Sequence, residues 1–66
     1  MYDNGQTLTL DRHFQDHVDA TVPVQVYYQT DHKDIGFVEV YNSHFIKVNN
    51  IFYNRSLHVF ISRPGY

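Results

Sequence analysis

The sequence predicts a mainly β fold, in which a short N-terminal helix precedes five strands that bend into a small antiparallel barrel. From residue 22 onward the chain is a series of short apolar runs separated by turn-forming residues, which is typical of an all-β domain. Gly36 lies inside the second of these runs, and a glycine within a strand marks a sharp bend or a close approach of another segment. One strongly bent strand allows a short sheet to close into a barrel.

The length and composition limit what the chain can be. Sixty-six residues suffice for one domain, which we expect to span 1–66, close to the lower limit for independent folding. Because the chain contains no cysteine, neither a disulfide nor a thiolate metal site can support its core. Six tyrosines and five phenylalanines are many for so small an interior, so we expect self-association. The net charge of −2 argues against strong, sequence-blind binding to phosphate backbones.

Several classes of function are not expected. No apolar run approaches the ~18 residues that a membrane helix requires, so we expect no membrane partner. The missing cysteines and signal peptide favour a cytoplasmic location. The sequence has no Gly-x-Ser-x-Gly elbow and no glycine-rich phosphate loop, and a barrel of this size has no deep pocket of its own. We therefore expect no enzymatic activity, no cofactor and no small-molecule substrate.

The N-terminal part predicts a single helix. Residues 1–7 are polar and expected to be flexible, and the helix is expected at about 9–19. Leu10, Phe14 and Val18 recur every four residues and form one apolar stripe. So short a helix persists only when this stripe packs against another element.

The remaining chain predicts five strands. Alternation of valines with other residues from Val22 indicates a strand with one buried face. Asn49 and Asn50 tolerate positive φ, so they suit a two-residue type I′ turn between the third and fourth strands. The strands are expected at about 22–30, 34–42, 45–48, 51–54 and 57–62.

Two other patterns bear on possible sites. His13 and His17 lie four residues apart on the expected helix, a spacing that can hold a zinc or copper ion with help from Asp16. Two histidines without a third fixed ligand more commonly lie exposed on the helix surface, so we expect no metal site. The last two strands are apolar on both faces, which predicts a subunit interface. Its expected residues are Tyr53, Val59, Phe60 and Ile61.

A set of short motifs carries a family resemblance. The motifs are Val22-Pro23-Val24, the segment 36–42 (GFVEVYN), Phe45, the segment 53–57 (YNRSL) and Ser62-Arg63-Pro64. In their order and spacing they resemble the Sm-like (LSm) family, and especially its bacterial members of the Hfq type. The resemblance implies an SH3-type barrel of five strongly bent strands behind a short helix.

The resemblance also implies a function. Members of this family form rings and bind single-stranded RNA, so it implies a cyclic homo-oligomer, such as a hexamer, that binds U-rich or A-rich RNA. Phe45 would stack on a base, Asn54 would read a base edge and Arg55 would contact phosphate. Tyr27 and Lys33 would help to hold A-rich RNA on the opposite face of the ring.

The chain also departs from the family pattern. Asn54 and Arg55 replace a Lys-His pair of the family. His44 precedes Phe45, so it is expected beside the stacking aromatic at the pore. Asp16 and Asp19 lie where the family has arginines on its outer rim. The alternative function is therefore a protein-interaction or assembly module that uses the same fold without nucleic acid.

Overall fold

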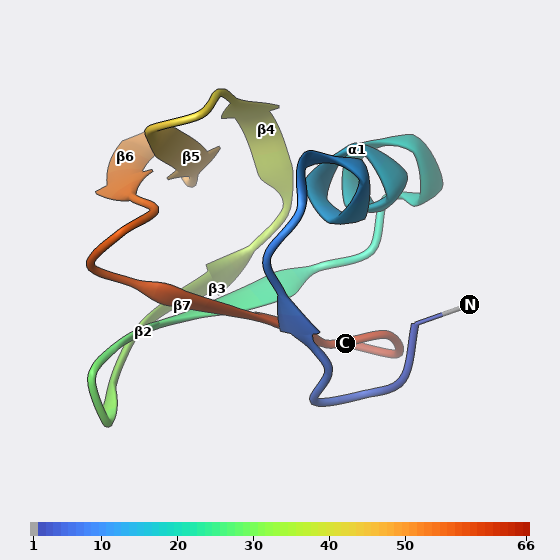
Figure 1. The fold of residues 1–66 in the computed structure, drawn as a ribbon. Coiled ribbons are helices and arrows are strands. Elements are labelled where there is room, and N and C mark those ends of the chain that lie inside the picture. Colours follow the sequence, from blue (N-terminus) through green and yellow to red (C-terminus); the bar gives the residue numbers. More distant parts are fainter. Residues whose placement is uncertain (1) are drawn as a thin grey trace.

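The computed structural model describes residues 2–66, which form seven strands and one helix (Figure 1). The elements are β1 (Thr7–Leu8), α1 (Asp11–Ala20), β2 (Val24–Tyr28), β3 (Asp31–Gly36), β4 (Val38–Tyr41), β5 (Phe45–Val48), β6 (Ile51–Asn54) and β7 (Val59–Ser62). Sheet A has the strand order β1-β7-β2-β3 and sheet B the order β4-β5-β6; both are antiparallel. A mainly β structure with one short helix is therefore confirmed. Within residues 2–66, no helix has the length and apolar content needed to cross a membrane.

The two sheets are open, so the expectation of a closed barrel is wrong. The physical reason lies at β7, which pairs with β2 on one side and with β1 on the other. Within residues 2–66, β6 pairs with β5 on one side and with no strand on its other side, which we call the open edge of β6. Thr7 of β1 belongs to the segment expected to be flexible, but it pairs with β7. Met1 of that segment lies outside the described residues.

The strand expected at 34–42 is divided between the two sheets. β3 ends at Gly36 and β4 begins at Val38, so the chain passes from sheet A to sheet B at Phe37 (Figure 1). A Cβ atom on Gly36 would lie 2.8 Å from both Oδ1 and Nδ2 of Asn49. The glycine therefore permits a close approach, as its place in the sequence indicates, and the approaching group is a side chain.

The core lies between the sheets and the helix. Valines of β2 and β4 meet aromatic residues of α1, β6 and β7, as expected for a short helix that packs on a sheet. Phe14 packs edge-on against Phe60, with their ring centroids 5.5 Å apart. The buried apolar residues are Leu8, Phe14, Val24, Val26, Val38, Ile46, Val48, Tyr53 and Phe60.

One histidine of the helix is part of this interior. His17 is buried beside the buried Ser62 of β7, although the sequence favours an exposed position. Nδ1 of His17 lies 2.6 Å from the carbonyl oxygen of His13; because a carbonyl only accepts, Nδ1 carries the hydrogen. Nε2 then accepts a hydrogen bond of 2.7 Å from the Ser62 hydroxyl. Within residues 2–66, no three His, Cys, Asp or Glu side chains gather as metal ligands would.

The ends of α1 and the hairpin turn have specific local causes. Leu10 precedes the helix and offers no polar side-chain atom, so Nδ1 of His13 accepts hydrogen bonds from the backbone N–H groups of Thr9 and Leu10. The helix ends at Ala20, and the C-cap residue Thr21 has a left-handed φ of 53°. The β5–β6 turn has positive φ at both Asn49 (52°) and Asn50 (66°), which confirms the expected type I′ geometry.

Candidate binding surface

Sheet B presents aromatic side chains on its outer face. Ile46 and Val48 of β5 point into the core, so Phe45 and Lys47, which alternate with them, point outward. Phe52 of β6 is paired with Lys47 and therefore lies on the same face. Phe45 is 39% exposed and Phe52 is 59% exposed. We call Phe45, Lys47 and Phe52 the aromatic patch.

The aromatic patch combines two rings with one compensated charge. The ring centroids of Phe45 and Phe52 lie 6.1 Å apart with an interplanar angle of 80°, an edge-to-face arrangement. Nζ of Lys47 lies 5.3 Å from the centroid of Phe52. The same Nζ lies 3.9 Å from Oε1 of Glu39. The patch is therefore apolar, and its one cation has an anion beside it.

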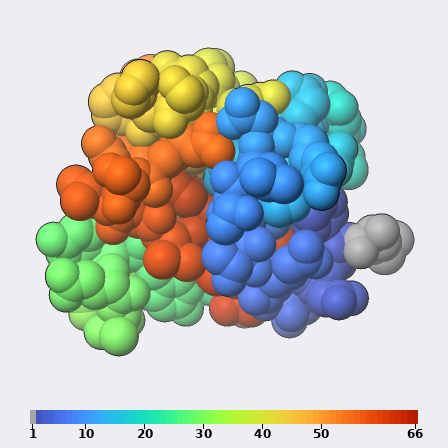
Figure 2. Space-filling view, in the orientation of Figure 1, coloured from blue at the N-terminus to red at the C-terminus, as the bar shows by residue number. Residues whose placement is uncertain are grey.

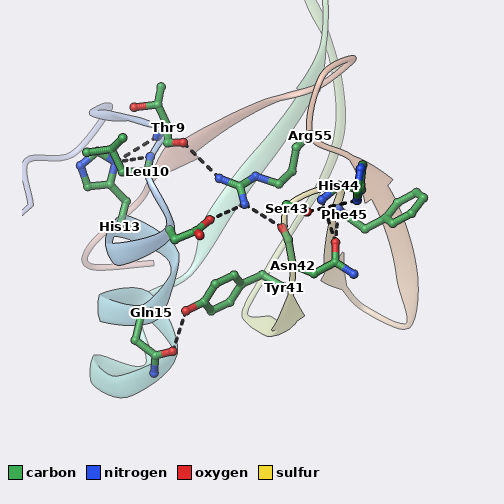
Figure 3. Close-up of polar contacts among 11 residues, drawn as sticks. Thr9, Leu10, His13, Gln15, Tyr41, Asn42, Ser43, His44, Phe45 and Arg55 are labelled. Carbon is green, nitrogen blue, oxygen red and sulfur yellow. Dashed lines mark hydrogen bonds and ion pairs between the residues drawn. The ribbon is translucent and has the colours of Figure 1, made fainter.

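A tight turn positions the edge of the patch. Oδ1 of Asn42 accepts hydrogen bonds of 2.8 Å from the backbone N–H groups of both His44 and Phe45 (Figure 3). The His44 ring lies 6.5 Å from the ring of Phe45. Asn54 is the strand partner of Phe45, but its Oδ1 accepts hydrogen bonds from the backbone N–H and the hydroxyl of Ser56. The structure thus brings His44, Phe45 and Asn54 together, with the Asn54 carbonyl already engaged in a turn.

Arg55 is held within the protein (Figure 3). Its guanidinium donates hydrogen bonds to Oδ1 of Asp11 (2.6 Å) and to the carbonyl oxygens of Asn42 (2.7 Å) and Thr9 (3.1 Å). The guanidinium carbon also lies 4.8 Å from the ring centroid of Phe14. With its side chain only 15% exposed, Arg55 ties the β6–β7 connection to the start of α1 and to the β4–β5 turn. It does not join the aromatic patch.

The residues expected on the opposite face of a ring lie in sheet A. Tyr27 of β2 pairs with His32 of β3, and their ring centroids are 5.7 Å apart. Nζ of Lys33 lies 6.0 Å from the ring of Tyr28. Tyr27 and Lys33 therefore both lie on the β2–β3 hairpin of sheet A, apart from Phe45 on sheet B.

The four expected interface residues divide into two pairs. Tyr53 and Phe60 are only 8% and 2% exposed within a single chain, so their side chains belong to the core. Val59 is exposed, and the half-buried Ile61 is paired with Thr7 of β1. The outward residues that could contact another molecule are thus Val59 and Ile61.

A partly buried hydrogen bond links the two sheets behind the patch. The hydroxyl of Tyr53 in β6 donates to Oδ2 of Asp34 in β3 at 2.8 Å. Burial, together with the hydrogen bond to this carboxylate and its charge, raises the pKa of Tyr53 to about 12. Partial burial alone would raise the pKa of Asp34, but hydrogen bonds from Tyr53, Asn49 and the Ile35 N–H outweigh it and leave that pKa lowered.

Sequence reasoning missed Phe52 and Lys47 as surface residues. Residues 51–53 are all apolar, so no alternation shows which of them points outward. The signal lies in β5, where Ile46 and Val48 flank a lysine and the type I′ turn fixes the pairing with β6. Comparison with protein-family models, with curated proteins and with solved structures found no match to this chain.

Proposed function

We propose that the protein is an assembly module that self-associates through the open edge of β6. One observation carries this proposal: the open edge belongs to a strand without charged residues, whose Ile51 and Phe52 side chains are exposed. An exposed apolar strand edge is a template on which another strand can pair. The occupant that the proposal requires is a strand of a second copy of the chain.

One of the two outer strands of sheet A provides a contrast. That strand is β3, and it carries Asp31, Lys33 and Asp34. Charged side chains on an edge strand hinder its pairing with another chain. The charge pattern therefore hinders pairing at the β3 edge, whereas β6 carries no charge that would oppose it.

The charges around β6 also favour a second copy as the partner. Lys47 lies beside Glu39, so the aromatic patch next to the open edge has little net charge. Two copies of such a surface can meet without the like-charge repulsion that opposes wrong pairings. Depletion of charge at an aromatic surface is also typical of the centre of protein interfaces.

The strand order supports a specific geometry for the assembly, an Sm-like cyclic oligomer. The order β7-β2-β3 of sheet A continues through Phe37 into the order β4-β5-β6 of sheet B. In an Sm-like ring, β6 of one copy would lie beside β7 of the next. Val59 and Ile61 would then contribute their outward side chains to the contact.

Sedimentation velocity over a range of protein concentrations tests the assembly. We expect the wild-type protein to form an oligomer at micromolar concentration and the Phe52→Lys variant to remain monomeric. Leu10→Lys is the matched control, because Leu10 is 48% exposed and the charge change is the same, but it lies at the start of α1. A wild-type monomer, or equal effects of the two variants, contradicts the proposal.

Single-stranded RNA binding is a second candidate, favoured by the two exposed rings of the aromatic patch. Stacking of a base on an aromatic ring contributes about 1–3 kcal/mol and tolerates different sequences, so U-rich or A-rich RNA could bind. The engagement of Arg55 with Asp11 leaves Lys47 as the cation at the patch, which favours the assembly proposal over this one.

Fluorescence anisotropy with short oligo-U and oligo-A at low salt tests the RNA proposal. We expect binding that weakens when Phe45 is replaced by alanine. Phe37→Ala is the control, since Phe37 is exposed but lies between β3 and β4, outside the aromatic patch. If neither RNA binds at low salt, where electrostatic attraction is strongest, the RNA candidate is wrong.

A further inference from the structure

The N-terminal residues occupy the strand edge that an assembly through β7 would need. We call residues 2–8 the strap. Its last two residues are β1, which pairs with β7. Before β1, the Ser62 N–H donates to the carbonyl of Gln6 and the Gly5 N–H donates to the carbonyl of Ser62, both at 2.8 Å. In the space-filling view, the blue N-terminal residues cover part of the orange and red C-terminal strand (Figure 2).

The strap is anchored at its two ends. Leu8 is buried in the core, while the side chains of residues 3–7 are exposed. At the other end, the Tyr2 hydroxyl donates to Oδ2 of Asp16 at 2.7 Å, and the Tyr2 ring lies 4.5 Å from the ring of His17. A segment with few buried apolar contacts opens at a lower free energy than the core. The part between these anchors can therefore leave β7 without unfolding of the sheets.

The edge beneath the strap is suited to another strand. β7 has the same length as β6, and neither strand carries a charged residue. The strap covers this edge incompletely, because a hollow of about 230 Å³ lies beside Val59, with Thr9 and Arg55 on its walls, where the chain leaves β1 toward α1. The exposed Val59 gives an incoming strand a place to begin pairing.

We infer that the strap is an intramolecular cap on β7, which a strand from a second copy must displace before it can pair there. This inference rests on the proposed self-association. A backbone N–H or C=O group on that edge can bond either the strap or the incoming strand, so the two compete. The measured dissociation constant then equals that of the uncapped contact divided by the fraction of molecules whose strap is open.

Two glycines provide a matched test of the cap. Gly5 in the strap and Gly65 near the C-terminus have positive φ values of 95° and 94°, and a Cβ at either position meets no atom closer than 3.6 Å among the described residues. At both positions the positive φ strains any residue that carries a Cβ atom, valine included. Gly5→Val strains the closed strap, whereas Gly65→Val introduces the same strain outside it. Tyr2→Ala opens the strap by a second route, since it removes the anchor on α1.

Sedimentation velocity, which gives the dissociation constant, and circular dichroism, which gives the secondary structure, test the inference on these variants. For Gly5→Val and Tyr2→Ala, we expect native secondary structure and a dissociation constant lower than wild type by about tenfold, or ~1.4 kcal/mol. We expect Gly65→Val to associate as the wild type does. If the Tyr2→Ala and Gly5→Val variants associate no more tightly than Gly65→Val, the cap is wrong. If Phe52→Lys still disrupts assembly in that case, the proposed function stands; if every protein is monomeric, both fail.

Discussion

The side chain of Asn49 fills the space in which a Cβ atom of residue 36 would lie, and it can do so because residue 36 is Gly36. Nδ2 of Asn49 donates hydrogen bonds to Oδ1 of Asp34 at 2.8 Å and to the carbonyl oxygen of Ile35 at 3.0 Å. Asn49 belongs to the turn between β5 and β6 in sheet B, whereas its partners belong to β3 in sheet A. This contact therefore joins the two sheets beside the point where the chain passes between them.

Replacement of Gly36 by alanine should destabilise the protein through this contact. A methyl group would displace the Asn49 amide and break its two hydrogen bonds, so we expect a loss of about 1–3 kcal/mol in the free energy of unfolding. Chemical denaturation measures this loss. A double-mutant cycle supplies the control: in an Asn49→Ala background, Gly36→Ala should cost little. Equal costs in both backgrounds would show that Asn49 is not the cause.

Stability should decline at alkaline pH because of Tyr53. Its pKa is raised to about 12 in the folded protein, compared with ~10 for tyrosine in an unfolded chain. The contribution of the raised pKa is fully present below about pH 10 and is lost as the pH rises through the folded value. Urea denaturation at several pH values should therefore show the free energy of unfolding falling over this interval.

A Tyr53→Phe variant is the control for this pH dependence. Phenylalanine does not titrate, so the decline above about pH 10 should be shallower in the variant than in the wild type. The lowered pKa of Asp34 acts at the opposite end: its contribution is present above ~3.9 and is lost as the pH falls through the folded value. Parallel alkaline profiles of the two proteins would contradict the role given to Tyr53.

Replacement of Arg55 by alanine should reduce stability. The change leaves the Asp11 carboxylate and two backbone carbonyls without their donor and removes the contact with the Phe14 ring. We expect a loss of about 1–3 kcal/mol in thermal or chemical denaturation. Arg12→Ala is the control: Arg12 is exposed on α1, so its replacement should change the free energy of unfolding by less than about 0.5 kcal/mol. Similar values for the two variants would mean that Arg55 is not a structural tie.

Glycine at position 21 should stabilise the protein. Thr21 has a left-handed φ of 53°, which costs about 1–2 kcal/mol for a residue with a Cβ atom. Glycine adopts this conformation without strain but adds entropy to the unfolded chain, so we expect a net gain of about 0.5–1 kcal/mol. The melting temperature of Thr21→Gly should rise, whereas that of Thr30→Gly, in a turn outside the left-handed region, should fall. A lower melting temperature for Thr21→Gly would contradict this reading of the helix end.

Local patterns predicted the local features of this fold. The positive φ values of Asn49 and Asn50 follow from the chemistry of asparagine, and the break at Gly36 follows from a missing side chain. The open sheets could not be predicted in this way. They depend on β1, and a two-residue strand in a polar segment has no periodicity that would reveal its pairing with β7.

The candidate surface could be predicted only in part. Phe45 is outward, as expected, because it alternates with the buried Ile46. Arg55 looked available in the sequence because its acceptors, such as Asp11, are remote along the chain. Only the folded arrangement brings the start of α1 next to the β6–β7 connection, where the guanidinium of Arg55 donates its hydrogen bonds to groups of the protein itself.

Hydrogen exchange at the backbone amides of β6, measured at low and high protein concentration, tests self-association through the open edge most directly. An outward N–H on this edge exchanges rapidly in a monomer and slowly once a strand of another copy accepts its hydrogen bond. We expect the protection of the outward amides within Ile51–Asn54 to rise with concentration, while the amides of β5 change little. Fast exchange of the outward β6 amides at every concentration would contradict the proposed assembly.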